Sequence, residues 1–423
     1  MDNIRSLLIL MLILGAGTCG ARENGPEYLI DQAIKHSALK NNFSGYEIIN
    51  DLESENTRNN YLPGITLQGQ AKYQGDVPQV PVNIPNINIP LPPNTQYMAT
   101  LNLEQLIWDG GVSAVSADMA HIDKQIGYFS VSAGLYSIKE NVLNLYFSAI
   151  MLDKNLKVLN SSLNELNERK KQVSALVEEG VILESELKEI KIKILQIEQS
   201  IRSLKADKSA VIKMLEIRTG LDNIVIDSDK PAEPESDFIQ EELNRPEIRQ
   251  MEAQSGKMKQ AGRLAYTEAM PKLSAYVQGG YGNPNPQNFF EDEPSTFYAA
   301  GINLQWKLWA WNLPAKKEQI MRVNSEIIEN NKKNLIESIN MSIAKEKEAI
   351  NSYRELIQKD IEIVRLREDI KNVKFSQLQN GVINSAEYIS AVEAFDKAKT
   401  GLELNKVALL RAKYNILQIS GNL

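Results

Sequence analysis

Two long stretches of the sequence carry hydrophobic residues at alternating spacings of three and four. In the first stretch they are Leu135, Ile138, Val142, Leu145, Ala149, Leu152, Leu156, Leu159, Leu163 and Leu166. In the second they are Ile336, Ile339, Ile343, Ile350, Tyr353, Ile357 and Val364, with Glu346 and Asp360 interrupting the series. This heptad spacing predicts left-handed supercoiled helices. A continuous helix from Val112 to Glu179 would be about 100 Å long, several times the width of an ordinary domain.

Four shorter segments alternate between hydrophobic and polar residues. The hydrophobic positions are Ile65, Leu67, Ala71 and Tyr73; Tyr97, Ala99, Leu101 and Leu103; Leu273, Ala275, Val277 and Tyr281; and Tyr298, Ala300, Ile302, Leu304 and Trp306. A period of two predicts strands with one hydrophobic and one polar face. Each segment has about 10 residues, the length that crosses a membrane when strands are tilted in a barrel.

The polar faces of these strands would line the lumen of such a barrel, where we expect the charged residues Lys72, Glu104, Lys272 and Lys307. For a single hairpin of this kind, a soluble antiparallel sheet with one solvent-exposed face would be a better explanation than a membrane barrel. Two matched hairpins favour the membrane. Four strands are too few to close a barrel, since the smallest known barrels have about eight, so several copies must share one.

The sequence repeats itself at an offset of about 200 residues, the signature of an internal duplication. The matched residues include Gly180, Val181 and Ile182 with Gly381, Val382 and Ile383, and Leu103 and Trp108 with Leu304 and Trp309. Because these pairs share one offset, we expect the long helices of the two halves to have equal lengths.

The duplication divides the chain into eight segments. A signal peptide at 1–21 precedes a helix at 22–60, a barrel hairpin at 61–109 and a long helical hairpin at 110–220. A linker at 221–240 leads to a second helix at 241–270, a second barrel hairpin at 271–311 and a second long helical hairpin at 312–423. The linker is acidic and contains Pro231 and Pro234, as is typical of connectors.

A glycine ends each outgoing long helix in a turn compatible with the left-handed conformation, and Glu186 and Glu387 then start the returning helices. These turns are predicted at the end of the helices that is remote from the strands. We therefore expect a docking partner to meet the chain at Gly180, Val181 and Ile182 and at Gly381, Val382 and Ile383.

The first residues have the layout of a secretory signal peptide, with Arg5, an apolar run from Leu7 to Leu14, and then small residues. Cleavage after Ala21 fits the rule of small residues at alternate positions before the cut. Lipidation of Cys19 is the alternative, although the residues before it lack the usual leucine. No later segment reaches the roughly 18 to 20 consecutive apolar residues of a transmembrane helix, so a membrane-spanning part would have to be a β-barrel.

Composition argues against several functional classes. The 47 basic and 54 acidic residues give a net charge of −7 and are interspersed along the same segments, so no basic stripe indicates nucleic-acid binding. His36 and His121 stand alone, and no Ser-His-Asp set, phosphate loop or cluster of metal ligands can be read. Cys19 is the only cysteine, so a chain cut after Ala21 forms no disulfide. We expect no enzymatic activity, no metal site and no cofactor.

Seven segments of the chain, taken in order, resemble the landmark segments of the TolC-like outer-membrane efflux family. They are YLPGITLQGQAKY, LNLEQLIWDGG, EEGVILESEL, NRPEIRQMEAQ, AMPKLSAYVQGGYG, INLQWKLWAWN and LQNGVINSAEYI. Each segment by itself is only weakly specific for the family. Their shared order and their duplication make the resemblance specific. The resemblance covers nearly the whole chain after the signal peptide.

The resemblance implies an α+β membrane protein and a homotrimer, in which four strands from each subunit form one twelve-stranded β-barrel in the outer membrane. A long α-helical coiled-coil barrel would continue it across the periplasm. The implied partners are outer-membrane lipid, a periplasmic adaptor protein and an inner-membrane RND or ABC transporter. Family members carry acidic residues around the pore at the helical tip. Glu387 matches one such position, and Ser390 stands at the next, so a double acidic ring is not expected.

The expected function is that of an exit duct in a tripartite efflux pump of a Gram-negative envelope, passing small molecules such as drugs or metals to the outside. A type I protein-secretion channel shares this architecture, and the sequence does not separate the two. A coiled-coil envelope protein without a pore is the alternative from a different class. Such a protein would be released from the envelope without detergent, whereas a channel would need detergent for its extraction from the membrane.

Overall fold

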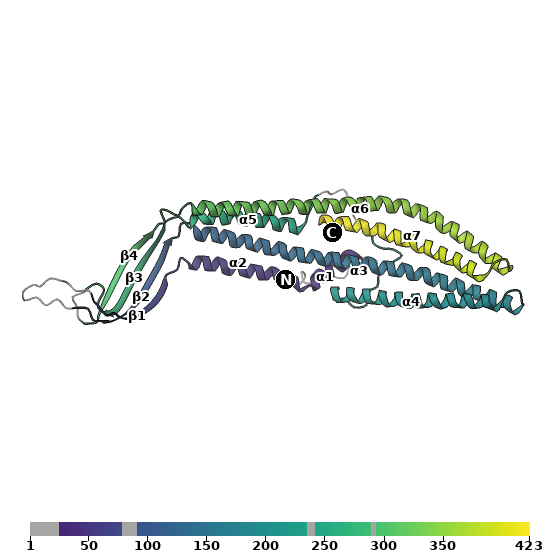
Figure 1. Ribbon diagram of the computed structural model, residues 1–423, viewed down its shortest axis with the longest axis horizontal. Helices are drawn as coiled ribbons and strands as arrows, with labels where there is room; N and C mark the ends of the chain where they lie inside the picture. The colour runs from purple at the N-terminus through teal and green to yellow at the C-terminus, as the bar shows by residue number, and fades with distance from the viewer. Residues whose placement is uncertain (1–24, 78–90, 235–241, 289–292) are drawn as a thin grey trace, which may run out of the picture. The chain divides into compact units, whose positions relative to one another are not determined.

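The computed structural model describes residues 25–77, 91–234, 242–288 and 293–423 (Figure 1). The predicted signal peptide and Cys19 lie outside the described residues. The elements are α1 (Pro26–His36), η1 (Ala38–Asn41), α2 (Asn42–Asn59), β1 (Gly64–Tyr73), β2 (Thr95–Trp108), α3 (Val112–Glu178), α4 (Glu184–Thr219), α5 (Pro246–Thr267), β3 (Lys272–Asn283), β4 (Ser295–Gln305), α6 (Leu313–Gln379) and α7 (Ser385–Ser420).

The chain divides into two compact units. The sheet unit comprises the described parts of 43–129 and 249–333, and the helical unit comprises the described parts of 1–42, 130–248 and 334–423. Helices α3 and α6 contribute residues to both units. Among the described residues, no helix combines the length and hydrophobicity needed to cross a membrane.

The sheet unit is built on one antiparallel sheet with the strand order β1-β2-β3-β4 (Figure 1). The four strands contain 10, 14, 12 and 11 residues. The central pairing of β2 with β3 joins the first repeat to the second, and its register shifts between Leu106 and Trp108. Strands β1 and β4 are the edges of the sheet.

The two halves have long helices of equal length, as the constant offset predicts. Helices α3 and α6 each contain 67 residues, and α4 and α7 each contain 36. The turns between them use glycines with positive φ, 71° at Gly180 and 66° at Gly381. A Cβ atom at either position would meet nothing within 4 Å, so glycine is needed there for its backbone conformation and not for space.

The helical unit has a core to which both repeats contribute. Leu156, Leu166 and Val173 of α3 pack with Ile190, Ile194 and Ile197 of α4, with Phe375 and Leu378 of α6, and with Tyr388 and Val392 of α7. The predicted heptad series of α3 is confirmed, because its members are buried or half-buried. The series of α6 is less covered: Ile339 and Ile350 are buried, but Ile357 and Val364 are only half-buried.

The interruption of the second series at Asp360 has a partner in the structure. The Asp360 carboxylate accepts a hydrogen bond from the side-chain amide of Asn405 on α7 at 2.7 Å. A polar contact thus replaces hydrophobic packing at this point between α6 and α7.

Candidate functional site

One face of the sheet collects the predicted hydrophobic positions of all four strands. The register sets Leu67 opposite Leu101, and Val277 opposite both Leu103 and Ala300. These side chains are uncovered: the exposed fraction is 77% for Leu67 and 81% for Tyr298. The prediction of one continuous hydrophobic face is confirmed. We call this surface the hydrophobic face.

The polar face of the same sheet is the better covered one. Thr100 is 2% exposed and Phe297 is 7% exposed, and both lie on this face. The Phe297 ring lies over Gly280 on the neighbouring strand, where a Cβ atom would overlap it. The Tyr276 ring lies over Gly301 in the same way, 3.0 Å from where a Cβ would be. Aromatic side chains therefore fill the space that these two glycines leave.

This distribution is the reverse of that in a sheet folded in water, where the hydrophobic face is the covered one. A contiguous exposed hydrophobic surface marks contact with a membrane or another protein. The sheet unit is therefore suited to an apolar environment outside its hydrophobic face and to a polar space on the other side.

Three of the four predicted lumen residues lie on the polar face. The register places Lys72 opposite Gln96, Glu104 opposite Tyr276, and Lys272 opposite Gln305. Lys72 also lines a small pocket of about 200 Å³ at one end of the sheet.

Trp306 and Lys307, predicted on the hydrophobic and the polar face, lie beyond the end of the strand, so the place of Lys307 in the lumen stays a prediction. Strand β4 ends at Gln305, because β3 begins at the opposing residue Lys272 and offers no backbone partner beyond it. The alternation of hydrophobic and polar residues continues past the last residue that a neighbouring strand can hold.

The turns at the end of the helical unit are closed by matching hydrogen bonds. The amide of Val181 donates to the carbonyl of Leu176 at 2.9 Å, and that of Val382 donates to Gln377 at 2.9 Å. Both valines are exposed, Val382 by 69%. The predicted docking residues Gly180 and Gly381 are exposed beside them.

Ile182 belongs to the predicted docking surface but is buried in the structure. Its side chain is only 8% exposed, and Ile383 of the second turn packs against the core of the helical unit. The turn places its first hydrophobic residue outward and the next one inward, so the two isoleucines fasten the turns to the core.

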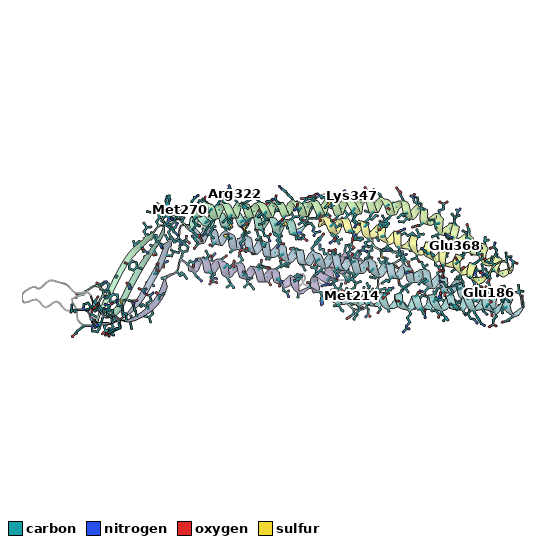
Figure 2. All side chains as sticks on the ribbon, in the orientation of Figure 1. Glu186, Met214, Met270, Arg322, Lys347 and Glu368 are labelled. Atoms are coloured by element: carbon teal, nitrogen blue, oxygen red, sulfur yellow. The ribbon has the colours of Figure 1, made fainter. Side chains whose placement is uncertain are left out.

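Glu186 and Glu387, which occupy equivalent positions in the two repeats, have different partners. The Glu186 carboxylate, near the start of α4 (Figure 2), accepts a hydrogen bond from the backbone amide of Ser385 and so caps α7. The Glu387 carboxylate lies 2.8 Å from the amine of Lys374 on α6, and the Glu387 amide donates to the side chain of Asn384. The candidate pore residue Glu387 is exposed but ion-paired, and Ser390 is exposed on the same helix.

A group of charged residues, of which Lys371 is buried and the others half-buried, joins the hairpins of the two repeats. The amine of Lys371 on α6 lies 2.6 Å from the carboxylate of Glu165 on α3 and 4.0 Å from the centre of the Phe395 ring. Asp396 on α7 accepts a hydrogen bond from the hydroxyl of Ser162 on α3. Burial raises the pKa of Asp396 above its ordinary value despite that hydrogen bond.

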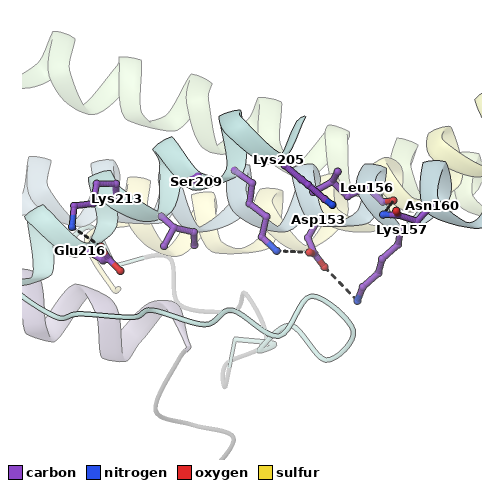
Figure 3. Close-up of a pocket in the computed structure, with 10 residues that line it drawn as sticks. Asp153, Leu156, Lys157, Asn160, Lys205, Ser209, Lys213 and Glu216 are labelled. Carbon is purple, nitrogen blue, oxygen red and sulfur yellow. Dashed lines mark hydrogen bonds and ion pairs between the residues drawn. The ribbon is translucent and has the colours of Figure 1, made fainter. Parts of the chain in front are cut away.

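A groove of about 550 Å³ lies between α3 and α4 (Figure 3). Several of its charged residues pair with one another: Lys157 lies 3.3 Å from Asp153, and Lys213 lies 3.0 Å from Glu216. Burial opposes ionisation of Asp153, but hydrogen bonds from Lys208 and Ser228 hold its pKa below the ordinary value. Such mutual pairing fits a structural role. Among the described residues, no group of three or more His, Cys, Asp or Glu could hold a metal ion.

Comparison with solved structures shows similarity along nearly the whole chain. The structure of CusC, whose study concerns transmembrane channel formation, has a TM-score of 0.72 at 12% identity and covers 94% of this chain and 92% of that one. The outer membrane protein VceC of Vibrio cholerae has a TM-score of 0.69 at 13% identity, covering 94% and 96%. The outer-membrane channel CmeC of Campylobacter jejuni has a TM-score of 0.64 at 15% identity, and the match covers 94% of this chain and 85% of that one.

No protein-family model matches the sequence, and no curated protein matches it either. The similarity at these identities concerns the fold. The chain has the fold of TolC-like outer-membrane channels, with four antiparallel strands and long helices, and the predicted α+β fold class is confirmed.

Proposed function

We propose that this protein is the outer-membrane exit duct of a tripartite efflux pump and reaches from the outer membrane into the periplasm. The observation that carries the proposal is the hydrophobic face of the sheet, which nothing in the described chain covers and which lies opposite a polar face. A membrane-spanning barrel has this arrangement, with hydrophobic residues toward lipid and polar residues toward a water-filled lumen. The similarity in fold to outer-membrane channels supports it.

The lumen requires several copies of the chain. Within the described residues, the outer edges of β1 and β4 have no neighbouring strand, and four strands do not close a barrel. In a homotrimer, β4 of one copy would pair with β1 of the next to give twelve strands. Closure would also remove the unpaired edges, which otherwise promote aggregation.

The helical unit offers matching surfaces for the same assembly. Helix α6 carries an exposed hydrophobic series at heptad spacing, formed by Leu356, Ile363, Leu366, Ile370 and Val373. Helix α4 carries exposed Ile192 and Leu195. Heptad series of this kind pack against another helix, and in a ring of copies α6 of one copy would meet α4 of the next.

The mechanism is conduction, in which the duct performs no chemical step. An inner-membrane transporter, RND or ABC, would drive cargo into the duct, and a periplasmic adaptor would hold the two together at the turns that expose Val181 and Val382. Glu387 and Ser390 lie beyond the second turn on α7 and would border the pore there. Because Lys374 neutralises Glu387, we expect only weak cation selectivity at that constriction.

A type I protein-secretion channel is the second candidate, because the same geometry would serve it and only the cargo differs. A coiled-coil envelope protein without a pore is a poorer account, because it leaves the hydrophobic face in water. These two alternatives are separated by different observations, the first by cargo and the second by assembly.

The test is the mass of the complex extracted from outer membranes in mild detergent, corrected for bound detergent. We expect three copies and no release without detergent. A monomer or dimer released into buffer would contradict the proposal and favour the envelope protein.

A further inference from the structure

The turn between β2 and α3 shows how one repeat packs against the next. Asp109 accepts hydrogen bonds from the amides of Gly111 at 2.9 Å and Ser113 at 2.7 Å, and so caps α3. Gly110 follows with φ 78°. A Cβ atom on Gly110 would lie 2.6 Å from the Cβ of Met270, in the junction between α5 and β3 of the second repeat. This contact within one chain therefore admits no side chain at position 110.

The corresponding turn of the second repeat carries a tryptophan at that position. The segments QLIWDGG and WKLWAWN align by the duplication, which places Trp309 at the position of Trp108 and Trp311 at that of Gly110. Trp311 and Asn312 have φ of 52° and 59°, the left-handed conformation that side chains disfavour. The Trp311 side chain is 79% exposed. Its ring makes an edge contact with the Trp309 ring, 5.7 Å away between ring centres. The chain thus keeps a strained backbone for an indole that is otherwise exposed.

The chain also carries the surface that would complete this contact. The junction between α2 and β1, residues 59–63, is the first-repeat counterpart of the α5–β3 junction that receives Gly110. This junction already contacts the first repeat on one side, where the Tyr61 hydroxyl donates a hydrogen bond to the Asp109 carboxylate at 3.1 Å. Leu62, the counterpart of Met270, is exposed. The two surfaces belong to opposite edges of the sheet, so they cannot meet within one chain.

We propose that Trp311 of one copy packs against residues 59–63 of the next copy, so that the contact between copies repeats the contact between the halves of one chain with a tryptophan in place of a glycine. This inference rests on the proposed ring of copies. Because the contact within the chain has no room for a Cβ atom, the two chains must lie farther apart where copies meet. The indole fills that wider space, and burying it offsets the strained backbone.

The contact is tested by a disulfide between Asn312→Cys and Asn59→Cys, the counterparts of Gly111 and Thr267, whose Cγ2 lies 3.6 Å from a Cβ placed at Gly111. Co-expressing the two single variants allows only a bond between copies. With Trp311 in place the two cysteines should be too far apart to bond, whereas a covalent dimer of chains is expected in the extracted complex when Trp311→Gly is added, since the chains can then approach. The pair Asn312→Cys with Asp51→Cys, farther along α2, is the control and should stay unlinked.

A second measurement concerns the indole itself. Trp311→Ala should lower the temperature at which the complex dissociates in detergent, more than Trp309→Ala does on the same turn. An intact three-copy complex that forms no disulfide even with Trp311→Gly, or whose dissociation temperature is unchanged by Trp311→Ala, would overturn this contact and leave the exit duct standing. Strong quenching of Trp311 fluorescence by brominated lipid would assign the indole to the membrane and also overturn the contact. Chains that are monomeric by mass would overturn both proposals.

Discussion

An arginine on the hydrophobic face should destabilise the chain in a bilayer far more than an arginine beside it on the polar face. Leu101 lies in the central strand β2 opposite Leu67 and Gly279, and it is 53% exposed. Asn102 follows it on the other face, opposite Thr66 and Gln278. Leu101→Arg and Asn102→Arg therefore place the same charge at nearly the same depth on opposite faces.

The cost of Leu101→Arg in free energy of unfolding depends on whether the residue faces lipid or water. An arginine facing lipid near the middle of a bilayer costs about 2–4 kcal/mol. At 1.4 kcal/mol for each factor of ten, the folding equilibrium would fall roughly 30- to 700-fold. In water, a substitution at an exposed position usually changes the free energy of unfolding by less than about 0.5 kcal/mol. Asn102 is half-buried on the polar face, so Asn102→Arg should cost more than this but clearly less than Leu101→Arg.

The assay is equilibrium unfolding by guanidinium in phosphatidylcholine vesicles, followed by tryptophan fluorescence. It yields the free energy of unfolding of the parent and of each variant. Equal costs for Leu101→Arg and Asn102→Arg would refute the reasoning, because the two faces would then meet the same solvent.

Three further predictions concern the helical unit. Lys374→Ala should increase the cation selectivity of the reconstituted channel by freeing Glu387, and an unchanged reversal potential under a salt gradient would remove Glu387 from the pore. Gly381→Ala should destabilise by about 1 kcal/mol because of its positive φ, while Gly401→Ala within α7 should stabilise by roughly 0.5–1 kcal/mol; thermal unfolding compares them. Burial raises the pKa of the Asp396 carboxyl in the folded protein, so folding favours its protonated form. The stability that the protonated carboxyl contributes is present below the pKa of the unfolded chain and is lost as the pH rises through the pKa of the folded protein. Asp396→Asn should therefore increase the free energy of unfolding at neutral pH but not below the pKa of the unfolded chain. A pH-independent difference in unfolding would contradict this.

The sequence carries the strands and their faces because a period of two is a local property. The alternation around Leu101 and Val277 needs no knowledge of the partner strands to show which residues share a face. The equal lengths of the long helices likewise follow from the constant offset between repeats. These features could therefore be predicted before any contact was known.

Contacts between distant segments could not be predicted in this way. Phe297 covers Gly280 only because β3 and β4 pair in one particular register, which their alternating pattern does not specify. The partners of Glu186 and Glu387 depend on how α4, α6 and α7 pack, although both residues occupy the same position in their repeats. Val181 and Ile182 are neighbours in the chain and both hydrophobic, yet the conformation of the turn exposes the first and buries the second.

The central claim is that copies of this chain enclose a water-filled path across a membrane. The most direct measurement is the conductance of the purified complex in a planar lipid bilayer. We expect discrete conductance steps from the parent protein, with far fewer insertions from Leu101→Arg than from Asn102→Arg. A complex that inserts into the bilayer without carrying current under any applied voltage or salt gradient would contradict the account.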